Sequence, residues 1–173
     1  MRSLVLLPII ALASSHAVAA PDEAFHDFAA LTGEWTCHGI FPASGKTIDS
    51  TLRFEFDLNG KALVKHHDDT SPPAMYHALE AWGYDAKNTR YNAAILDNFG
   101  GARVFSSDGW KDGRLVWTSA PEVKPAQRFI YAHEANQGLR IDWEVLKGDS
   151  YVVGDTLHCT PQHSSHQASS STR

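Results

Sequence analysis

Side chains that could transfer protons or bind a metal occur at three places in this sequence: residues 66–69 (His-His-Asp-Asp), Glu80 and His133. Each place lies in a segment with the alternation of a β-strand. If His66, Glu80 and His133 share the inward face of a barrel, they could bind a metal, orient the polar end of a ligand or do acid–base work. The alternative is that they lie at wet strand ends and touch only solvent. Their spacing matches no recognised site.

The established catalytic and cofactor motifs are missing from the chain. His66 and His67 are adjacent in a strand and point to opposite faces, so they cannot chelate one ion together without a bulge. The sequence contains no G-x-S-x-G, S-x-x-K, H-E-x-x-H or C-x-x-C-H motif and no Gly-rich phosphate loop before a helix. We therefore expect no cofactor and no metal, and the sequence identifies no catalytic residue.

The first residues predict export. Arg2 precedes an apolar run from Leu4 to Leu12, and small residues follow up to Ala17-Val18-Ala19. This is the pattern of a secretory signal peptide with an A-x-A cleavage site, which we assign to residues 1–19. The apolar run is shorter than the roughly 20 residues that span a bilayer. We expect a periplasmic or secreted protein without membrane insertion.

The composition excludes some partners. Removing residues 1–19 from 173 leaves 154, enough for one domain with a substantial core. Only Arg2 is lost from the 15 basic residues, so 14 remain against 20 acidic ones. An acidic chain without a basic cluster is not suited to nucleic acid. The composition does not determine an oligomeric state.

Cys37 and Cys159 are the only cysteines. In an oxidising compartment, an even pair normally forms a disulfide. This bridge would close a loop of more than a hundred residues, worth about 4–5 kcal/mol in the chain-entropy description. A free pair used in redox or metal chemistry is the alternative, but the chain has no C-x-x-C and both cysteines lie in strand-like segments.

The remaining sequence alternates with period two between frequent turn signals, which indicates an all-β domain. A short helix is expected over Asp22–Leu31, where Pro21 and acidic residues precede spaced apolar positions. The expected strands are Glu34–Phe41, Thr47–Phe56, Lys61–Asp69, Tyr76–Gly83, Arg90–Asp97, Ala102–Ser107, Arg114–Ser119, Gln127–Glu134, Leu139–Lys147 and Tyr151–Thr160.

Short connections make neighbouring strands antiparallel, which leaves an up-and-down barrel or a sandwich. The cysteines favour the barrel, because closure would bring the first and last strands side by side. We therefore predict an antiparallel up-and-down β-barrel of about nine or ten strands over residues 20–161. Residues 162–173 are mostly Ser, His and Gln and are expected to form a disordered tail.

Several short motifs carry a family resemblance. Residues 31–35 read L-T-G-E-W, in which Gly33 and Trp35 resemble the opening motif of lipocalins and other calycins. Further matching segments follow in order at Gly60–Leu63, Trp82–Asp85 and Gly113–Leu115. The set resembles a bacterial calycin-like domain family of unknown function. That resemblance implies a barrel with a central cavity and small apolar ligands. The last strand lacks the Arg that lipocalins usually place over the Trp, which favours a looser relative.

Three functions fit this barrel. The first is binding of a small apolar or amphipathic molecule in an aromatic cavity. The second is a structural or interaction domain with a filled core, and the third is an enzyme that uses an inward His or Glu as acid–base. For the first, the expected cavity-lining residues are Phe54, Trp82, Trp117, Tyr131, His133 and Trp143.

Overall fold

The structure, a computed structural model, describes residues 21–71 and 75–162. The signal peptide assigned to residues 1–19 and the expected tail beyond Gln162 lie outside these residues. The cleavage site and the tail therefore stay predictions.

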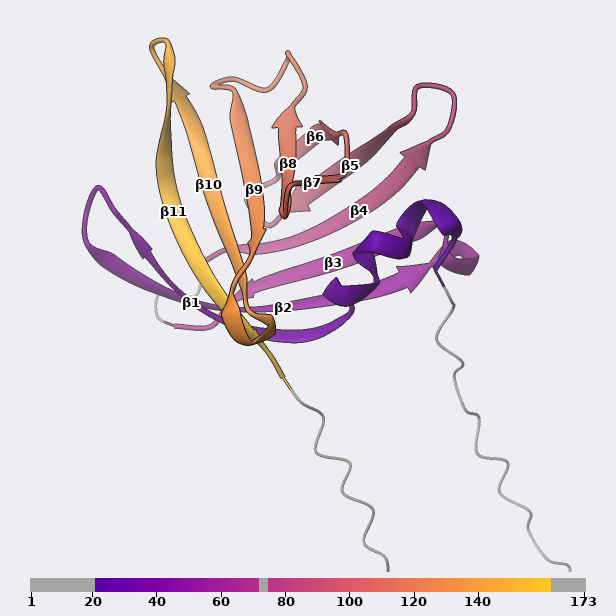
Figure 1. Cartoon of the computed structure of the whole chain (residues 1–173). Coiled ribbons are helices and arrows are strands. Elements are labelled where there is room, and N and C mark those ends of the chain that lie inside the picture. The colour runs from indigo at the N-terminus through magenta and orange to yellow at the C-terminus, as the bar shows by residue number, and fades with distance from the viewer. Residues whose placement is uncertain (1–20, 72–74, 163–173) are drawn as a thin grey trace, which may run out of the picture.

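One antiparallel sheet forms the whole domain (Figure 1). The elements in chain order are η1 (Glu23–Leu31), β1 (Gly33–Phe41), β2 (Lys46–Asp57), η2 (Leu58–Gly60), β3 (Ala62–Asp69), β4 (His77–Asp85), β5 (Arg90–Asp97), β6 (Ala102–Ser107), β7 (Trp110–Lys111), β8 (Arg114–Ser119), β9 (Gln127–His133), η3 (Ala135–Gln137), β10 (Leu139–Lys147) and β11 (Ser150–Pro161).

The sheet closes on itself. Consecutive strands pair from β1 to β6 and from β8 to β11, while β1 pairs with β11 and β6 with β8. Ten strands thus form the barrel, in agreement with the predicted antiparallel barrel of about nine or ten strands. The remaining strand, β7, has two residues and pairs only with β8. β7 was not predicted from the sequence, because two residues between turns carry no period-two pattern.

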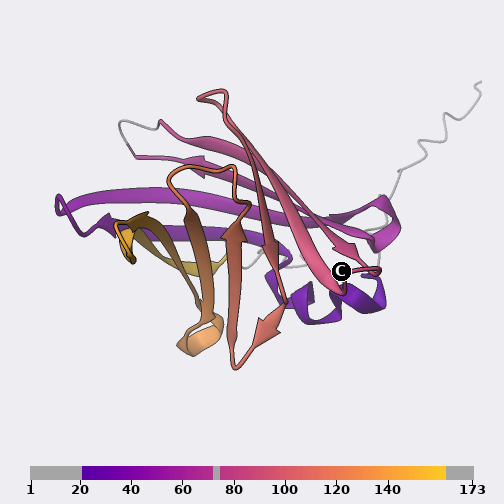
Figure 2. The same ribbon diagram turned by 90° about the horizontal axis from the view of Figure 1, so that it is seen from above.

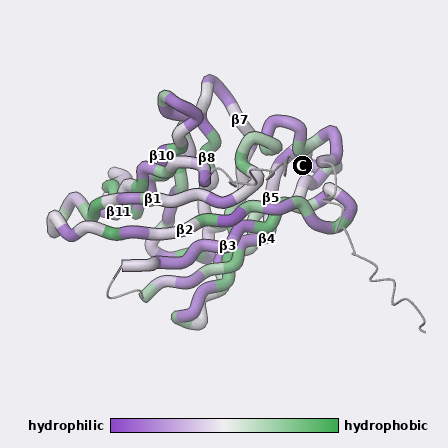
Figure 3. Tube along the Cα trace, turned by 90° about the horizontal axis from the view of Figure 1, so that it is seen from below, coloured by the Kyte–Doolittle hydropathy of each residue, from purple (hydrophilic) through white to green (hydrophobic). Residues whose placement is uncertain are grey.

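Alternating hydrophobicity along each strand determines which side chains face the interior. Polar and apolar segments alternate along the strands in Figure 3. In β2, for example, Leu52, Phe54 and Phe56 are buried while Glu55 is exposed. Burying one face of a closed sheet removes the apolar side chains from water and leaves no long unpaired edge.

The disulfide joins the two ends of the sheet. Cys37 of β1 is bonded to Cys159 of β11, and these two residues are direct cross-strand partners. The predicted bridge and its role in closing the barrel are both confirmed. On the opposite side, closure rests on two residue pairs between β6 and β8.

The N-terminal helix closes one end of the barrel. It lies where it was expected but has 3-10 geometry, with Asp22 capping it through a side-chain bond to the Ala24 amide. Phe25 packs edge-to-face on Phe56, and Phe28 packs in the same way on Trp82. Figure 2 shows this helix against one end of the strands. The half of the barrel beneath η1 is filled by side chains.

Candidate ligand-binding site

The other half of the barrel is hollow. A cavity of about 310 Å³ lies towards the β1–β2, β3–β4 and β5–β6 connections, at the end away from η1. This volume is at the lower end of the roughly 300–1,000 Å³ typical of small-molecule sites. The lining residues include the apolar Phe41, Ile48, Phe99, Phe129, Ile141, Trp143 and Leu157, and the polar Lys65, His67, Asp69, Tyr76, Glu80, Asp97, Arg103 and Asp155.

A buried ion pair stands at the boundary between the filled and hollow halves. Lys65 of β3 and Glu80 of β4 are cross-strand partners, and Lys65 Nζ donates to Glu80 Oε1 at 2.7 Å. Lys65 Nζ also donates to the Tyr131 hydroxyl at 3.0 Å, and Trp82 Nε1 donates to Glu80 Oε2 at 3.0 Å. Burial raises the pKa of Tyr131 well above its usual range, so this phenol stays protonated.

A second ion pair lies near the rim. Arg103 of β6 donates from Nη2 to Asp97 Oδ2 and to the Tyr76 hydroxyl, each at 3.0 Å, and from Nη1 to Gln127 Oε1 at 2.8 Å. Asp97 in turn accepts from the amide of Gly101 at 3.0 Å. The charge of Arg103 is therefore matched within the rim and its side chain is fixed.

His67 and Asp69 follow Lys65 along the inward face of β3. Burial lowers the pKa of His67, so its ring is neutral at neutral pH. Its buried Nε2 has no hydrogen-bond partner among the described residues and lies 3.6 Å from Asp69 Oδ1. Burial alone would raise the pKa of Asp69, but His67 and the Ser50 hydroxyl outweigh this effect and lower it. Asp69 is therefore a carboxylate.

Asp155 faces the cavity beside a β-bulge. The register between β10 and β11 shifts at this point, so Trp143 pairs with Asp155 and Glu144 with Val153, which leaves Gly154 unpaired. Bulges often redirect side chains next to functional sites. Residues 21–71 and 75–162 provide no hydrogen bond or ion pair to the Asp155 carboxyl. Burial, and next the charge of Asp69, raises its pKa to about 7.

The expected cavity-lining residues divide into three groups. Trp143 lines the cavity, as expected. Phe54, Trp82, Trp117 and Tyr131 are buried in the barrel, but they belong to the filled half. His133 is exposed, and its ring stacks on Trp110 at 4.3 Å between centroids. His133 thus keeps the inward register of β9, opposite the buried Leu139, but as the last residue of its strand it is exposed at the end of the barrel.

Of the other polar residues considered, Glu80 is inward and buried, as the hypothesis of an inward polar cluster required. His66 points outwards, opposite to the expectation from Ala62 and Val64, because Leu63, Lys65 and His67 occupy the inward face. The polar cavity residues that were missed include Lys65, His67, Arg103 and Asp155. Asp155 shares the parity of Leu157 and Cys159, a signal that could have identified it.

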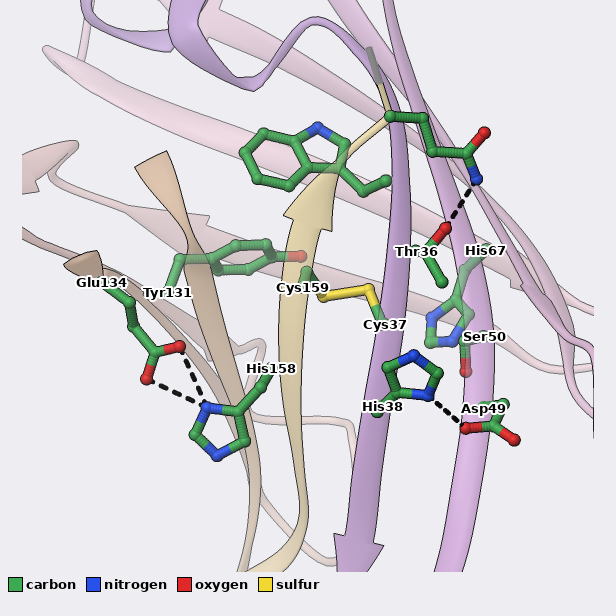
Figure 4. Close-up of a disulfide and its surroundings, with 12 residues drawn as sticks. Thr36, Cys37, His38, Asp49, Ser50, His67, Tyr131, Glu134, His158 and Cys159 are labelled. Atoms are coloured by element: carbon green, nitrogen blue, oxygen red, sulfur yellow. Dashed lines mark hydrogen bonds and ion pairs between the residues drawn. A yellow bond between two sulfur atoms is a disulfide. The ribbon is translucent and has the colours of Figure 1, made fainter. Parts of the chain in front are cut away.

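The outer face beside the disulfide also carries histidines, but they do not form a site. His38 and His158 are cross-strand partners. In Figure 4 their rings turn away from each other, His38 towards Asp49 at 2.6 Å and His158 towards Glu134 at 3.0 Å. Within the described part of the chain, no group of three or more His, Cys, Asp or Glu residues could hold a metal ion.

Comparison with known proteins adds no functional assignment. No family model and no curated protein matches this chain. Among the described residues, no helix has the length and apolar character needed to cross a membrane. What the fold and site define is a closed ten-stranded antiparallel barrel with one hollow, partly polar half.

Proposed function

We propose that this protein binds a small amphipathic molecule inside the open half of its barrel. The observation that carries the proposal is the cavity of about 310 Å³, whose walls are apolar and whose polar groups converge from several strands. Concave, mostly apolar sites with a few placed polar groups are typical of small-molecule binding. A structural domain with a filled core is expected to contain no such cavity.

The division of the barrel supports a binding role. The buried cluster of Phe54, Trp82 and Trp117 fills one half with directly contacting rings. Charged side chains in the other half are held by the Lys65–Glu80 and Arg103–Asp97 pairs. A fixed polar framework within apolar walls can receive a ligand with little reorganisation, which lowers the entropic cost of binding.

A titration with decanol tests this proposal. The fluorescence of Trp143, a wall residue, should change on binding, and native mass spectrometry should detect a one-to-one adduct. Ile48→Trp places an indole in the cavity and should weaken decanol binding at least tenfold. Ile40→Trp is the matched control, because Ile40 lies on the adjacent strand and is 42% exposed. Equal decanol binding by both variants would refute the proposal, and so would a wild type that binds neither decanol nor the amine or carboxylate of the same chain length.

General acid–base catalysis in the same cavity is a second candidate. The observation favouring it is the divergence between Asp69, whose pKa is lowered, and Asp155, whose pKa is raised to about 7. Neighbouring carboxyl groups with separated pKa values are a mark of acid–base sites.

An exchange experiment tests this second candidate. The protein is incubated with 2-decanone in D₂O, and loss of the α-proton signal is followed by NMR. We expect exchange at least tenfold faster than in buffer, with the excess removed by Asp155→Asn and retained by Asp149→Asn, a change at an exposed turn of the same hairpin. Exchange at the buffer rate would exclude this activity.

A further inference from the structure

The charges that line the cavity are not balanced. Both of its cations, Lys65 and Arg103, already have carboxylate partners at 2.7 and 3.0 Å. Two further carboxyl groups, Asp69 and Asp155, line the same space, and no Lys or Arg of the described residues pairs with either. The imidazole of His67, 3.6 Å from Asp69, is kept neutral because burial lowers its pKa. When both carboxyl groups are ionised, the cavity therefore carries two negative charges that no cation of the described residues balances.

Asp155 is the group that most requires a partner. An ionised carboxylate removed from water costs several kcal/mol unless a cation or hydrogen bonds compensate. Asp69 accepts from the Ser50 hydroxyl at 3.0 Å and from the Tyr76 amide at 3.3 Å, whereas residues 21–71 and 75–162 offer Asp155 no donor. A bound cation would supply what Asp155 lacks.

From this imbalance we propose that the polar end of the ligand is a protonated amine, held by Asp155 and Asp69 together. The inference rests on the proposed binding function and narrows its ligands to cationic amphiphiles. A protonated amine donates up to three hydrogen bonds, so one headgroup can reach two carboxylates. Its apolar portion would lie along Phe129, Ile141 and Leu157, which form part of the cavity wall.

The surroundings of Asp155 suit an organic cation better than a metal ion. The described residues contain no cluster of three or more acidic, His or Cys side chains that could ligate one ion. The indole of Trp143, the cross-strand partner of Asp155, also lines the cavity. Aromatic faces attract ammonium groups through the ring quadrupole. The two carboxyl groups and the indole are thus suited to an organic ammonium group.

A glycine at the bulge makes room for the Trp143 indole. A Cβ atom at Gly154 would lie 2.4 Å from Trp143 Cε3, so the indole rests directly on the glycine. Only a residue without a side chain permits this contact. Direct cross-strand pairing of Trp143 with Asp155 places the aromatic ring and the carboxyl on the same side of the sheet, and the glycine leaves room for the ring.

Protonation of Asp155 should oppose cation binding. The charges that act on this carboxyl are those of Asp69, Lys65 and Asp142. The remaining titratable or charged groups that line the cavity are His67, Tyr76, Glu80, Asp97 and Arg103. Because Asp155 loses its proton at about pH 7, a permanently protonated amine should bind more tightly at pH 8 than at pH 5.5.

The experiment compares three ligands of equal chain length: decylamine, decanol and decanoate. Their affinities for the purified protein are measured by isothermal titration calorimetry at pH 5.5 and pH 8. We expect decylamine to bind at least tenfold more tightly than decanol at pH 8, with a smaller preference at pH 5.5. Decanoate should bind more weakly than decanol. Asp155→Asn should remove most of the amine preference and leave decanol affinity within about twofold. Asp149→Asn should change neither.

The possible failures are distinguishable. Binding of decanol without any preference for decylamine overturns the cation assignment and leaves the proposed function intact. A preference for decanoate also overturns it. Failure of all three ligands to bind overturns the proposed function and the cation assignment with it. An amine preference that survives Asp155→Asn would show that other residues bind the ammonium group, and it would overturn the assignment to Asp155.

Discussion

Lys65 occupies a position where a charged residue is costly, since its side chain is only 2% exposed and that of Glu80 only 6%. Loss of one partner from such a pair leaves the other charge buried without compensation. Each charge of the pair is therefore needed mainly to compensate the other.

Lys65→Met should lower the free energy of unfolding by about 3–5 kcal/mol, because Glu80 would remain buried without its cation. The double variant Lys65→Met/Glu80→Gln should recover most of this loss, since glutamine still accepts from Trp82 Nε1. Urea unfolding monitored by circular dichroism measures both. Lys61→Met, at an exposed position, is the control. A single variant as stable as the wild type would contradict the role given to the pair.

Asp155 should make stability depend on pH. Its pKa rises from 3.8 to about 7 on folding, so between these values the native state holds a proton that the unfolded chain releases. Stability from this group is therefore full below about pH 4 and is lost as the pH rises to about 7.

Asp155→Asn should remove that dependence. Its stability gain over the wild type should be larger at pH 8 than at pH 4.5, by on the order of 2–4 kcal/mol. Urea unfolding at the two pH values provides the measurement, with Asp149→Asn as the charge-matched control. An equal effect at both values would show that Asp155 is ionised in the folded protein throughout.

At the scale of single elements, packing requires a glycine at the β10–β11 bulge. Gly154→Ala would force the Trp143 ring to move, because the new methyl group would lie 2.4 Å from Cε3. Overpacking of this kind costs about 1–3 kcal/mol. Thermal unfolding should show the loss, while Gly83→Ala, where a Cβ meets no atom within 4 Å, should change stability little. A shift of the Trp143 fluorescence spectrum in Gly154→Ala, but not in Gly83→Ala, would show that the loss of stability arises from displacement of the indole.

The strands were largely predictable from the sequence, but the cavity was not. Arg90–Asp97 and Leu139–Lys147 have the observed bounds because alternation and turn residues define them locally. Which half of the barrel is hollow depends instead on how the rings of Trp82 and Trp117 fill space across strands distant in sequence. The inward position of Lys65 was missed because a charged residue within an apolar run is more often exposed.

The disulfide acts on the whole molecule because its two cysteines are 122 residues apart. Cys37→Ala/Cys159→Ala should lower the free energy of unfolding by about 4–5 kcal/mol, mainly by enlarging the unfolded ensemble. Urea unfolding with and without reductant is the measurement. Reductant should move the wild type towards the variant and leave the variant unchanged. A wild type insensitive to full reduction would contradict this estimate.

Closure of the barrel is unequal on its two sides. β1 and β11 share six residue pairs and the disulfide, whereas β6 and β8 share only Phe105–Ser119 and Ser106–Thr118. Hydrogen exchange followed by mass spectrometry should therefore show faster exchange for the β6 and β8 amides, because opening there breaks few bonds. Equal protection of both contacts would show that the barrel opens only by global unfolding.

The covalent link between the first and last strands also makes most of the domain a closed ring of chain. A protease that cuts once in an exposed turn within this ring, such as the one at Asp149, breaks the ring without releasing a fragment. The nicked protein should keep its size on a non-reducing gel and separate into two pieces only after reduction. A single cleavage would thus leave the strands tethered and able to reassociate.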